Sequence, residues 1–242
     1  MEEQIIEQFV SQGKNHWWFA GRRKIFSTLM RRSLKPNPSR SILDVGCGAG
    51  ANLAMLSEFG RVTGLESDPG LNRHAASTNP GFRIIQKSVF SLLDEKFDVI
   101  SMFDVLEHIE DDEAALRWIH DTLSEDGIFF VAVPAHMAFW SKDDELSHHF
   151  RRYTPNGLLT VLSTQFQVAR MTHYNTFLSP LIYLIIRIRK MLGLDRGGDF
   201  EKGSEGIINS VLKLMFCSEA IWLRWFNFPF GVSLYAECRK KT

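Results

Sequence analysis

A carboxylate and several glycines lie close together in the segment Asp44-Val-Gly-Cys-Gly-Ala-Gly50. Glycines permit a tight turn and let a ligand approach the backbone, and a helix that begins after such a turn offers free N–H groups. Gly46, Gly48 and Ala51 also fit the dinucleotide pattern G-x-G-x-x-G/A. Asp44, however, would repel a pyrophosphate and attract a cationic ligand. The alternative without a ligand is an ordinary turn, in which Asp44 only accepts hydrogen bonds from backbone N–H groups.

A second carboxylate, Glu66, ends the next predicted strand, 22 residues after Asp44. An acidic side chain at this place can accept hydrogen bonds from both hydroxyls of a ribose. S-adenosylmethionine (SAM) carries such a ribose together with an ammonium and a sulfonium group, so SAM suits both carboxylates. NAD carries the ribose as well, which leaves a nicotinamide-dependent oxidoreductase as an alternative. A solvated surface glutamate is the other alternative for Glu66.

The elements that must position these residues alternate along the chain. Apolar runs predict strands at 41–45, 61–66, 82–86, 97–103, 127–134, 166–172 and 232–238. Helices are predicted at 51–59, 71–78, 111–123 and 157–164, between these strands. Strands that alternate with helices indicate right-handed crossovers and a parallel sheet covered on both faces. The predicted class is therefore α/β.

Three segments resemble a known family, namely LDVGCGAG, TGLESDP and FDVISMFDVLEHIED. They are similar to the first, second and fourth motifs of class I SAM-dependent methyltransferases, in the same order and spacing. NHWWFAGRRKIF, HHFRRYTPNGL and PFGVSLYAECRK resemble a small-molecule branch related to quinone-biosynthesis methyltransferases. The resemblance implies a Rossmann-like, seven-stranded, mostly parallel sheet whose last strand is antiparallel.

This resemblance also implies a domain organisation. Residues 1–242 form a single methyltransferase domain, in which 39–172 and 232–242 make the SAM-binding core. Residues 1–38 form an N-terminal helical cap. Residues 173–231 form a helical insert before the last strand, with one helix starting at Ser179-Pro180 and a second over 207–225.

The resemblance further implies roles for individual residues toward SAM. The methionine part is held by Asp44, Gly46, Cys47, Gly48 and Gly50. Glu66 holds the ribose with Ser67 beside it, while the adenine is bordered by Ser88, Val89 and Phe90. Phe103 and Asp104 face the methyl group and the acceptor. Arg22 pairs with the SAM carboxylate, or is one of several surface arginines.

Methyl transfer to a hydroxyl is an in-line displacement that often needs a base, and histidine suits that role near neutral pH. The catalytic candidates are His136, His108 and Asp104. We favour His136 because it follows the fifth strand at the carboxyl edge of the sheet. The alternative for His108 is a hydrogen-bonded residue at a helix start.

Candidate acceptor-binding residues fall into two groups. Arg151, Arg152 and Tyr153 can bind an anionic acceptor or can simply tether their loop. Trp17 and Trp18 can form an apolar lid over the acceptor; the alternatives are a second packed core and a membrane-facing surface. Acidic and histidine residues at 143–149 are predicted to form a solvated loop, and no metal site is expected, because no ligand spacing such as HExxH occurs.

Composition limits the classes of binding partner and the cellular location to be expected. Lys+Arg and Asp+Glu both number 28, so the net charge is zero and a nucleic-acid partner is not expected. The three cysteines, the absence of CxxC and the acidic N-terminus without a signal sequence favour the cytoplasm, with peripheral contact at the inner membrane through the insert left open. We therefore predict methyl transfer from SAM to a small-molecule or lipid-linked acceptor, at oxygen. A non-catalytic SAM-binding or membrane-docking protein is the further alternative.

Overall fold

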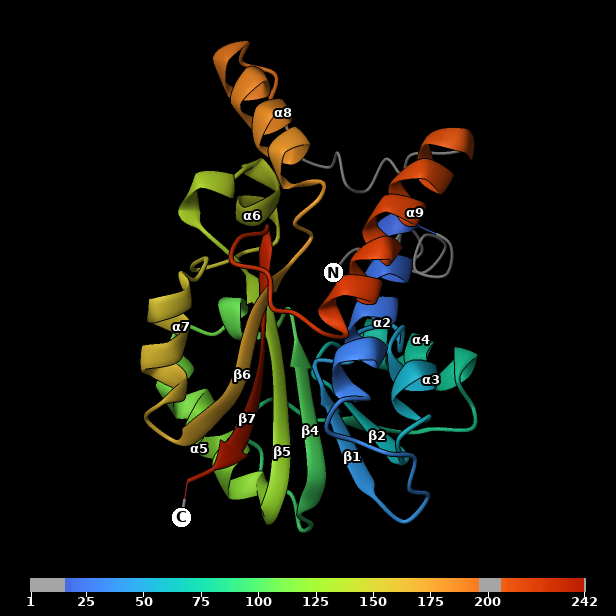
Figure 1. Cartoon of the computed structure of the whole chain (residues 1–242). Coiled ribbons are helices and arrows are strands. Elements are labelled where there is room, and N and C mark those ends of the chain that lie inside the picture. The colour runs from blue at the N-terminus through green and yellow to red at the C-terminus, as the bar shows by residue number, and fades with distance from the viewer. Residues whose placement is uncertain (1–15, 196–205, 242) are drawn as a thin grey trace.

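Seven strands form one sheet in the order β3-β2-β1-β4-β5-β7-β6 (Figure 1). The computed structural model describes residues 16–195 and 206–241. The strands are β1 (Ser41–Val45), β2 (Arg61–Glu66), β3 (Arg83–Gln86), β4 (Phe97–Phe103), β5 (Leu123–Pro134), β6 (Phe166–Tyr174) and β7 (Ser233–Lys240). All neighbours pair in parallel except β7, which runs antiparallel between β5 and β6. The predicted seven-stranded Rossmann-like sheet with an antiparallel last strand is confirmed.

After β1 the chain adds β2 and β3 on one side of β1, and then adds β4 on the other side of β1. β1 pairs with β2 on one side and with β4 on the other. Open α/β sheets bind ligands outside the carboxyl ends of the strands at such a reversal. This topological switch point brings the ends of β1, β2 and β4 together although they are far apart in sequence.

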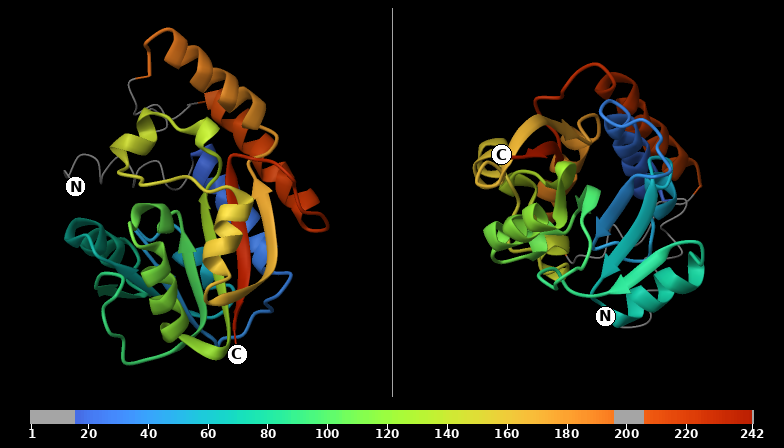
Figure 2. Two further views of the ribbon diagram at one scale, coloured as in Figure 1. Left: turned by 90° about the vertical axis from the view of Figure 1, so that its left-hand side faces the viewer. Right: turned by 90° about the horizontal axis from the view of Figure 1, so that it is seen from below.

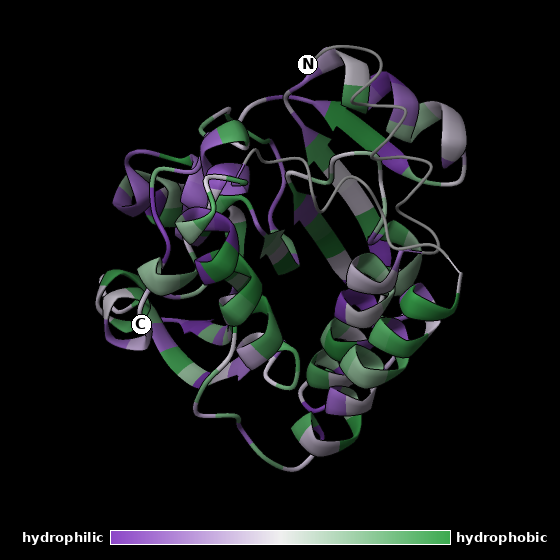
Figure 3. Cartoon of the chain, turned by 90° about the horizontal axis from the view of Figure 1, so that it is seen from above, coloured by the Kyte–Doolittle hydropathy of each residue, from purple (hydrophilic) through white to green (hydrophobic). Residues whose placement is uncertain are grey.

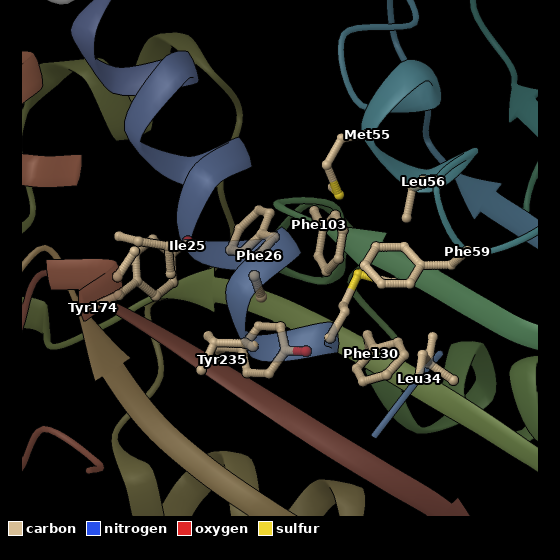
Figure 4. Packing of buried hydrophobic residues seen from close by; sticks show 14 of the residues in the cluster. Ile25, Phe26, Leu34, Met55, Leu56, Phe59, Phe103, Phe130, Tyr174 and Tyr235 are labelled. Carbon is tan, nitrogen blue, oxygen red and sulfur yellow. The ribbon is translucent and has the colours of Figure 1, made fainter. Parts of the chain in front are cut away.

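Helices cover both faces of the sheet, because successive strand residues point to opposite sides. Residues of α2 (Trp17–Met30) and α3 (Leu53–Leu56) join one core, in which the rings of Phe26 and Phe103 stack at 4.3 Å (Figure 4). Residues of α5 (Asp112–Thr122) and α7 (Pro155–Leu162) join the other. The remaining short elements are α4 (Pro69–Thr78), η1 (Leu106–His108), η2 (Met137–Phe139) and α6 (Lys142–Leu146).

Two helices lie between β6 and β7 in the chain, α8 (Ser179–Met191) and α9 (Gly206–Leu223). Both project beyond the carboxyl ends of the parallel strands (Figures 1 and 2). The C-terminal half of α9 packs against α2, since its buried residues are Phe216, Glu219, Ala220 and Leu223. In α8 only Ser179 is buried.

Some element boundaries differ from the sequence prediction. The predicted N-terminal helix begins at Trp17 within the described residues, and its first part, residues 1–15, lies outside them. The predicted helix over 51–59 shortens to α3, because turns occupy the flanking residues. Ser141 begins the unexpected helix α6, where Ser141 and Asp144 form a reciprocal capping box.

Candidate functional site

The glycine turn after β1 has a backbone that favours glycine. Gly46, Gly48 and Gly50 have φ angles of +67°, +55° and +85°. The N–H groups of Gly46 and Cys47 donate to the carbonyl of Leu65, at 2.8 and 3.1 Å, and so fix the turn against β2. A Cβ on Gly48 would meet nothing within 4 Å, so this glycine faces open space. The turn therefore leaves room for a ligand beside its backbone.

Asp44 at the end of β1 is a buried carboxylate with one unused oxygen. Ser101 donates to its Oδ1 at 2.8 Å, whereas its Oδ2 is buried without a hydrogen-bond partner. Burial raises the pKa of Asp44 to about 7, and the neighbouring Glu66 carboxylate adds to this effect. A buried carboxylate in this state gains from a cationic ligand, so the site fits the ammonium group of SAM.

Glu66 at the end of β2 is also buried, so it is no solvated surface residue. Its Oε2 accepts from the Gly48 N–H at 2.9 Å and its Oε1 from the Asp68 N–H at 2.8 Å. The carboxylate therefore connects the glycine turn to the start of α4. Carboxylate oxygens accept more than one hydrogen bond, which leaves capacity for ribose hydroxyls.

The other predicted cofactor residues surround this carboxyl edge in different ways. Cys47 is buried, and burial raises the pKa of its thiol. Phe103 is buried against Phe26. Ser67 and Ser88 are exposed, Val89 packs against the α5 side of the core, and Phe90 is half exposed with a positive φ of 80°. An exposed Phe90 ring beside the sheet is available to a flat ligand such as a purine.

Arg22 and Asp104 form an ion pair between α2 and the end of β4. The guanidinium also lies over the rings of Trp18 and Phe26, at 5.7 and 5.3 Å. Only 11% of the Arg22 side chain is exposed, which excludes the surface-arginine alternative. Asp104 has a φ of +53°, a conformation that non-glycine residues adopt rarely and that often marks a functional turn.

Glu107, three residues further on, is fully buried and neither carboxylate oxygen has a hydrogen-bond partner. Burial and the nearby Asp104 raise the pKa of Glu107 well above its ordinary value. Burial without a hydrogen-bond partner thus disfavours the charged form of Glu107. Glu107 was not among the predicted site residues, although it lies in the segment FDVISMFDVLEHIED three residues after Asp104.

Asp144 anchors a second cluster, and the prediction of a solvated loop was wrong for it. Its carboxylate is buried and accepts from His149 Nδ1 at 2.8 Å and from Arg152 Nε and Nη2 at 2.7 and 3.0 Å. Burial opposes ionisation, but these bonds outweigh it and lower the pKa of Asp144 to about 2. The bidentate ion pair with Arg152 compensates the cost of burying the Asp144 carboxylate. The polar composition of the segment alone did not indicate that Asp144 is buried.

Arg151 and Tyr153 are likewise held by the protein. Both donate to Oδ2 of Asp112 at the start of α5, each at 2.8 Å. Together with the Arg152–Asp144 pair, these contacts support the alternative that the three residues tether their loop.

His108 packs edge-on against His149, with ring centroids 4.6 Å apart. Burial lowers the pKa of His108 to about 4, so its imidazole is neutral. One potential ligand atom from each of Glu107, His108 and His149 lies within 4.8 Å of the others. This grouping could hold a metal ion, whereas no metal site is expected from the ligand spacing in the sequence. Residues 107 and 108 are distant from His149 in the chain, so spacing alone does not join them.

His136 pairs with a residue that sequence reasoning missed, His173 of β6. Their Nε2 atoms are 3.1 Å apart and their rings are stacked at 5.2 Å. Nδ1 of the buried His173 lies 3.2 Å from the carbonyl oxygen of Phe228. Burial lowers the pKa of both histidines. The sequence offered no signal for this pair, because the two residues come from β6 and from the segment after β5, which β7 brings together by lying between these strands.

Trp17 and Trp18 lie at the junction of α2 and α9. Their ring centroids lie 5.8 and 5.5 Å from that of Phe216 of α9, and the backbone N–H of Trp17 donates to Asn209 Oδ1 at 2.8 Å. Trp17 and Phe216 belong to the same core as Phe26 and Phe103, and Trp18 packs against it, so these contacts continue the sheet core outward between α2 and α9. Trp222 and Trp225, by contrast, are 53% and 72% exposed.

A cavity of about 1010 Å³ lies on the outer side of the glycine turn, between α2, α3, α4 and α9. It is lined by basic side chains, including Arg23, Lys24 and Arg224, and reaches Gly50. Asp44 and Glu66 do not line it. It is therefore separate from the carboxylates at the strand ends.

Comparison with known proteins agrees with this geometry. Residues 17–180 match the family model described as a methyltransferase domain, so the chain belongs to this methyltransferase family. The chain is 26% identical over 156 residues to a probable SAM-dependent methyltransferase of Mycolicibacterium smegmatis, covering 62% of the chain and 59% of that protein. It is 28% identical over 151 residues to a ubiquinone biosynthesis O-methyltransferase of Glaesserella parasuis, covering 54% of the chain and 64% of that protein.

A solved structure extends the likeness to almost the whole fold. The N-methyltransferase NodS of Bradyrhizobium japonicum, in complex with S-adenosylhomocysteine, superposes with a TM-score of 0.59 at 15% identity and covers 99% of this chain and 98% of that one. The match spans about three fifths of the length of the two curated relatives. The cofactor is SAM, as predicted, and the oxidoreductase alternative is wrong.

Proposed function

We propose that the chain transfers the methyl group of SAM to an oxygen atom of a small-molecule or lipid-linked acceptor. The observation that carries this proposal is the buried, unpartnered Oδ2 of Asp44 beside the glycine turn and Glu66. The acceptor oxygen is supported by the O-methyltransferases of ubiquinone biosynthesis among the relatives. When bound, SAM supplies an electrophilic methyl carbon on a positively charged sulfur.

In this proposal the residues of the turn and strand ends hold the cofactor. Asp44 attracts the ammonium group, Glu66 accepts from the ribose hydroxyls, and Gly48 allows close approach. Arg22 and Asp104 face the methyl-transfer region together, so Arg22 can also meet the cofactor carboxylate. Ser67, Ser88, Val89 and Phe90 border the adenine.

His136 is the proposed base, and His173 sets its tautomer. The Phe228 carbonyl can only accept, so His173 Nδ1 carries the proton and the Nε2 of a neutral His173 must accept from His136 Nε2–H. This leaves the lone pair of His136 on Nδ1. His136 Nδ1 would accept the proton of the acceptor hydroxyl as that oxygen takes the methyl group that bound SAM would supply.

The proposed location is the cytoplasm, with the acceptor reached at the inner face of the membrane. Phe139 and Phe230 flank His136, with ring centroids at 6.5 and 5.4 Å, so an apolar acceptor would find aromatic neighbours there. His108, the second candidate base, already packs against His149. A non-catalytic SAM-binding protein is the competing outcome.

Two measurements test this proposal in sequence. Calorimetry should detect SAM binding, and absence of binding at millimolar SAM would overturn it. Mass spectrometry should then detect methylation of a prenylated phenol as a probe acceptor. His136→Asn should lower kcat about 10²- to 10⁴-fold while SAM affinity is unchanged. The exposed His148→Asn is the matched control. An unchanged rate in His136→Asn would remove the base, and SAM binding without product for any phenol would favour the non-catalytic alternative.

A further inference from the structure

The helices α8 and α9 expose an unusual amount of apolar surface beyond the carboxyl edge of the sheet. Leu184, Ile188 and Met191 of α8 are 54%, 45% and 85% exposed. Ile207, Val211 and Leu214 of α9 are 82%, 50% and 72% exposed, and their spacing of four and three residues places them on one face of the helix. Figure 3 shows these hydrophobic stretches from above. Soluble monomers rarely leave such surface uncovered.

Residues 16–195 and 206–241 of the domain do not cover this surface. No residue of α8 after Ser179 is buried, and the buried residues of α9 begin only at Phe216. One side of each helix still contacts the domain, through Ile182 of α8 and through Asn209 and Leu212 of α9. The exposed apolar faces lie on the other side of each helix, beyond the carboxyl ends of the parallel strands (Figures 1 and 2).

The charges on these helices have one sign. Between residues 179 and 194 and between 206 and 230 the only acidic residue is Glu219, which is fully buried. The basic residues in the same stretches are Arg187, Arg189, Lys190, Lys213 and Arg224. Residues 195–205, which join the two helices in the chain, hold four acidic and two basic residues, so the excess of cations belongs to the helices themselves and not to their linker. Apolar side chains interspersed with Lys and Arg complement an anionic lipid surface.

We propose that α8 and α9 form a docking surface for an anionic bilayer, with their exposed faces entering the lipid headgroup region. This surface, defined by residues 181–194 and 207–215, is called the docking helices below. It would place the carboxyl ends of the parallel strands on the membrane side of the domain. Membrane docking by α8 and α9 rests on the proposed function in one respect: a lipid-linked acceptor is the reason for docking. Binding to lipid can be measured independently of methyl transfer.

Two other occupants fit less well. A second copy of the chain would bring the same cations of both copies together, which like-charge repulsion opposes. A membrane-spanning mode would use α9, which is 18 residues long with a mean hydropathy of 1.4. However, Phe216 and Leu223 are packed inside the domain, so α9 cannot cross a bilayer while this packing persists. Docking at the interface retains every contact of the fold.

Co-sedimentation of the full chain with lipid vesicles tests the proposal. We expect binding to vesicles of phosphatidylcholine with 30% phosphatidylglycerol (about one anionic lipid in three, which gives a negative surface potential). Binding should be weaker to pure phosphatidylcholine and should decline as salt is raised, because the charges are screened. Absence of binding to the anionic vesicles, or equal binding to both compositions, would overturn the proposal.

Substitutions locate the surface. Leu184→Glu and Leu214→Glu should each lower the partition coefficient by about tenfold or more, whereas Leu92→Glu, at an 87% exposed site in the segment between β3 and β4, should leave it unchanged. Arg187→Glu and Lys190→Glu should lower it about fivefold per unit of charge removed, with Arg61→Glu at the opposite edge of the sheet as control. Binding of these variants at the wild-type level would contradict the assignment.

Two further measurements, SAM calorimetry and light scattering, distinguish failure of membrane docking from failure of the proposed methyl transfer. SAM calorimetry on the same variants should be unchanged, so loss of lipid binding with intact SAM binding bears on the docking helices alone. Failure of SAM binding with intact lipid binding would instead overturn the proposed methyl transfer. Light scattering tests for a dimer. If the wild type is a dimer and Leu214→Glu is a monomer, the docking helices bind a second copy of the chain and the membrane proposal is overturned.

Discussion

The guanidinium of Arg22 in α2 forms an ion pair with the carboxylate of Asp104 at the carboxyl end of β4. This contact joins the N-terminal helix to the strand end where the methyl-transfer region is proposed. Burial raises the pKa of Asp104, and Arg22 opposes this effect. The pair therefore couples placement of α2 to the charge state of the site.

Removal of Arg22 should destabilise the fold and the site together. Arg22→Ala leaves Asp104 mostly buried without its cation, so we expect a loss of about 3 kcal/mol in unfolding free energy, measured by urea denaturation. The double variant with Asp104→Asn should recover part of this loss, because no uncompensated charge then stays buried. Additive effects of the two substitutions would contradict the coupling.

Binding of SAM should depend on the ionisation of Asp44. Because its pKa lies at about 7, the carboxylate is mostly protonated at pH 6 and mostly ionised at pH 8. We expect calorimetry to show about tenfold tighter binding at pH 8 than at pH 6. Asp44→Asn should bind SAM weakly at both values, which also controls for titration of the ligand itself. A flat profile in the wild type would argue against Asp44 as the partner of the ammonium group.

The Asp44 carboxylate should lower the stability of the ligand-free protein at high pH. The pKa of Asp44 is higher in the folded state than in the unfolded chain, so protonation favours folding, and this contribution is lost as pH rises through about 7. Asp44→Asn should therefore raise the Tm of the ligand-free protein at pH 8 more than at pH 5. Differential scanning calorimetry decides this; a Tm increase that is equal at both pH values would show that Asp44 does not titrate between them.

A methyl group on Gly48 should block the ligand more than it harms the fold. Gly48→Ala places a Cβ in open space beside the turn and forces a positive φ on alanine. We expect a stability loss of about 1–2 kcal/mol, the cost of the left-handed backbone, together with loss of SAM binding. Gly193→Ala is the matched control, because Gly193 has a φ of +64° and equally open surroundings. Both variants should lose similar stability, and only the first should lose SAM.

The junction of α2 and α9 should not tolerate a larger residue at Gly21. A Cβ there would lie 2.2 Å from the Phe216 ring, so Gly21→Ala must displace α9 or the ring. Overpacking of this kind costs about 1–3 kcal/mol. Gly81→Ala, whose Cβ would meet nothing within 4 Å, provides the control in thermal denaturation. If α9 is displaced, tryptophan fluorescence should change in Gly21→Ala alone, because Trp17 and Trp18 contact Phe216.

The sequence by itself determined the sheet and the cofactor turn, because both depend on local patterns. The strands at 41–45, 61–66 and 97–103 have the predicted bounds, since short apolar runs bordered by turn residues indicate buried strands. Asp44 and Glu66 could be paired from sequence because the carboxyl ends of adjacent parallel strands meet at one edge. Glycines at positions of positive φ were likewise visible as residue types.

Only the tertiary structure decided which polar side chains meet. The contacts of Arg22 with Asp104, of His136 with His173 and of Asp144 with Arg152 depend on helix placement, strand pairing and loop path. Polarity alone made Asp144 look solvated, whereas its bonds compensate its burial. The exposure of α8 and α9 was also undetermined, because an apolar helix can be buried in a core or left for another surface, and only its packing distinguishes the two.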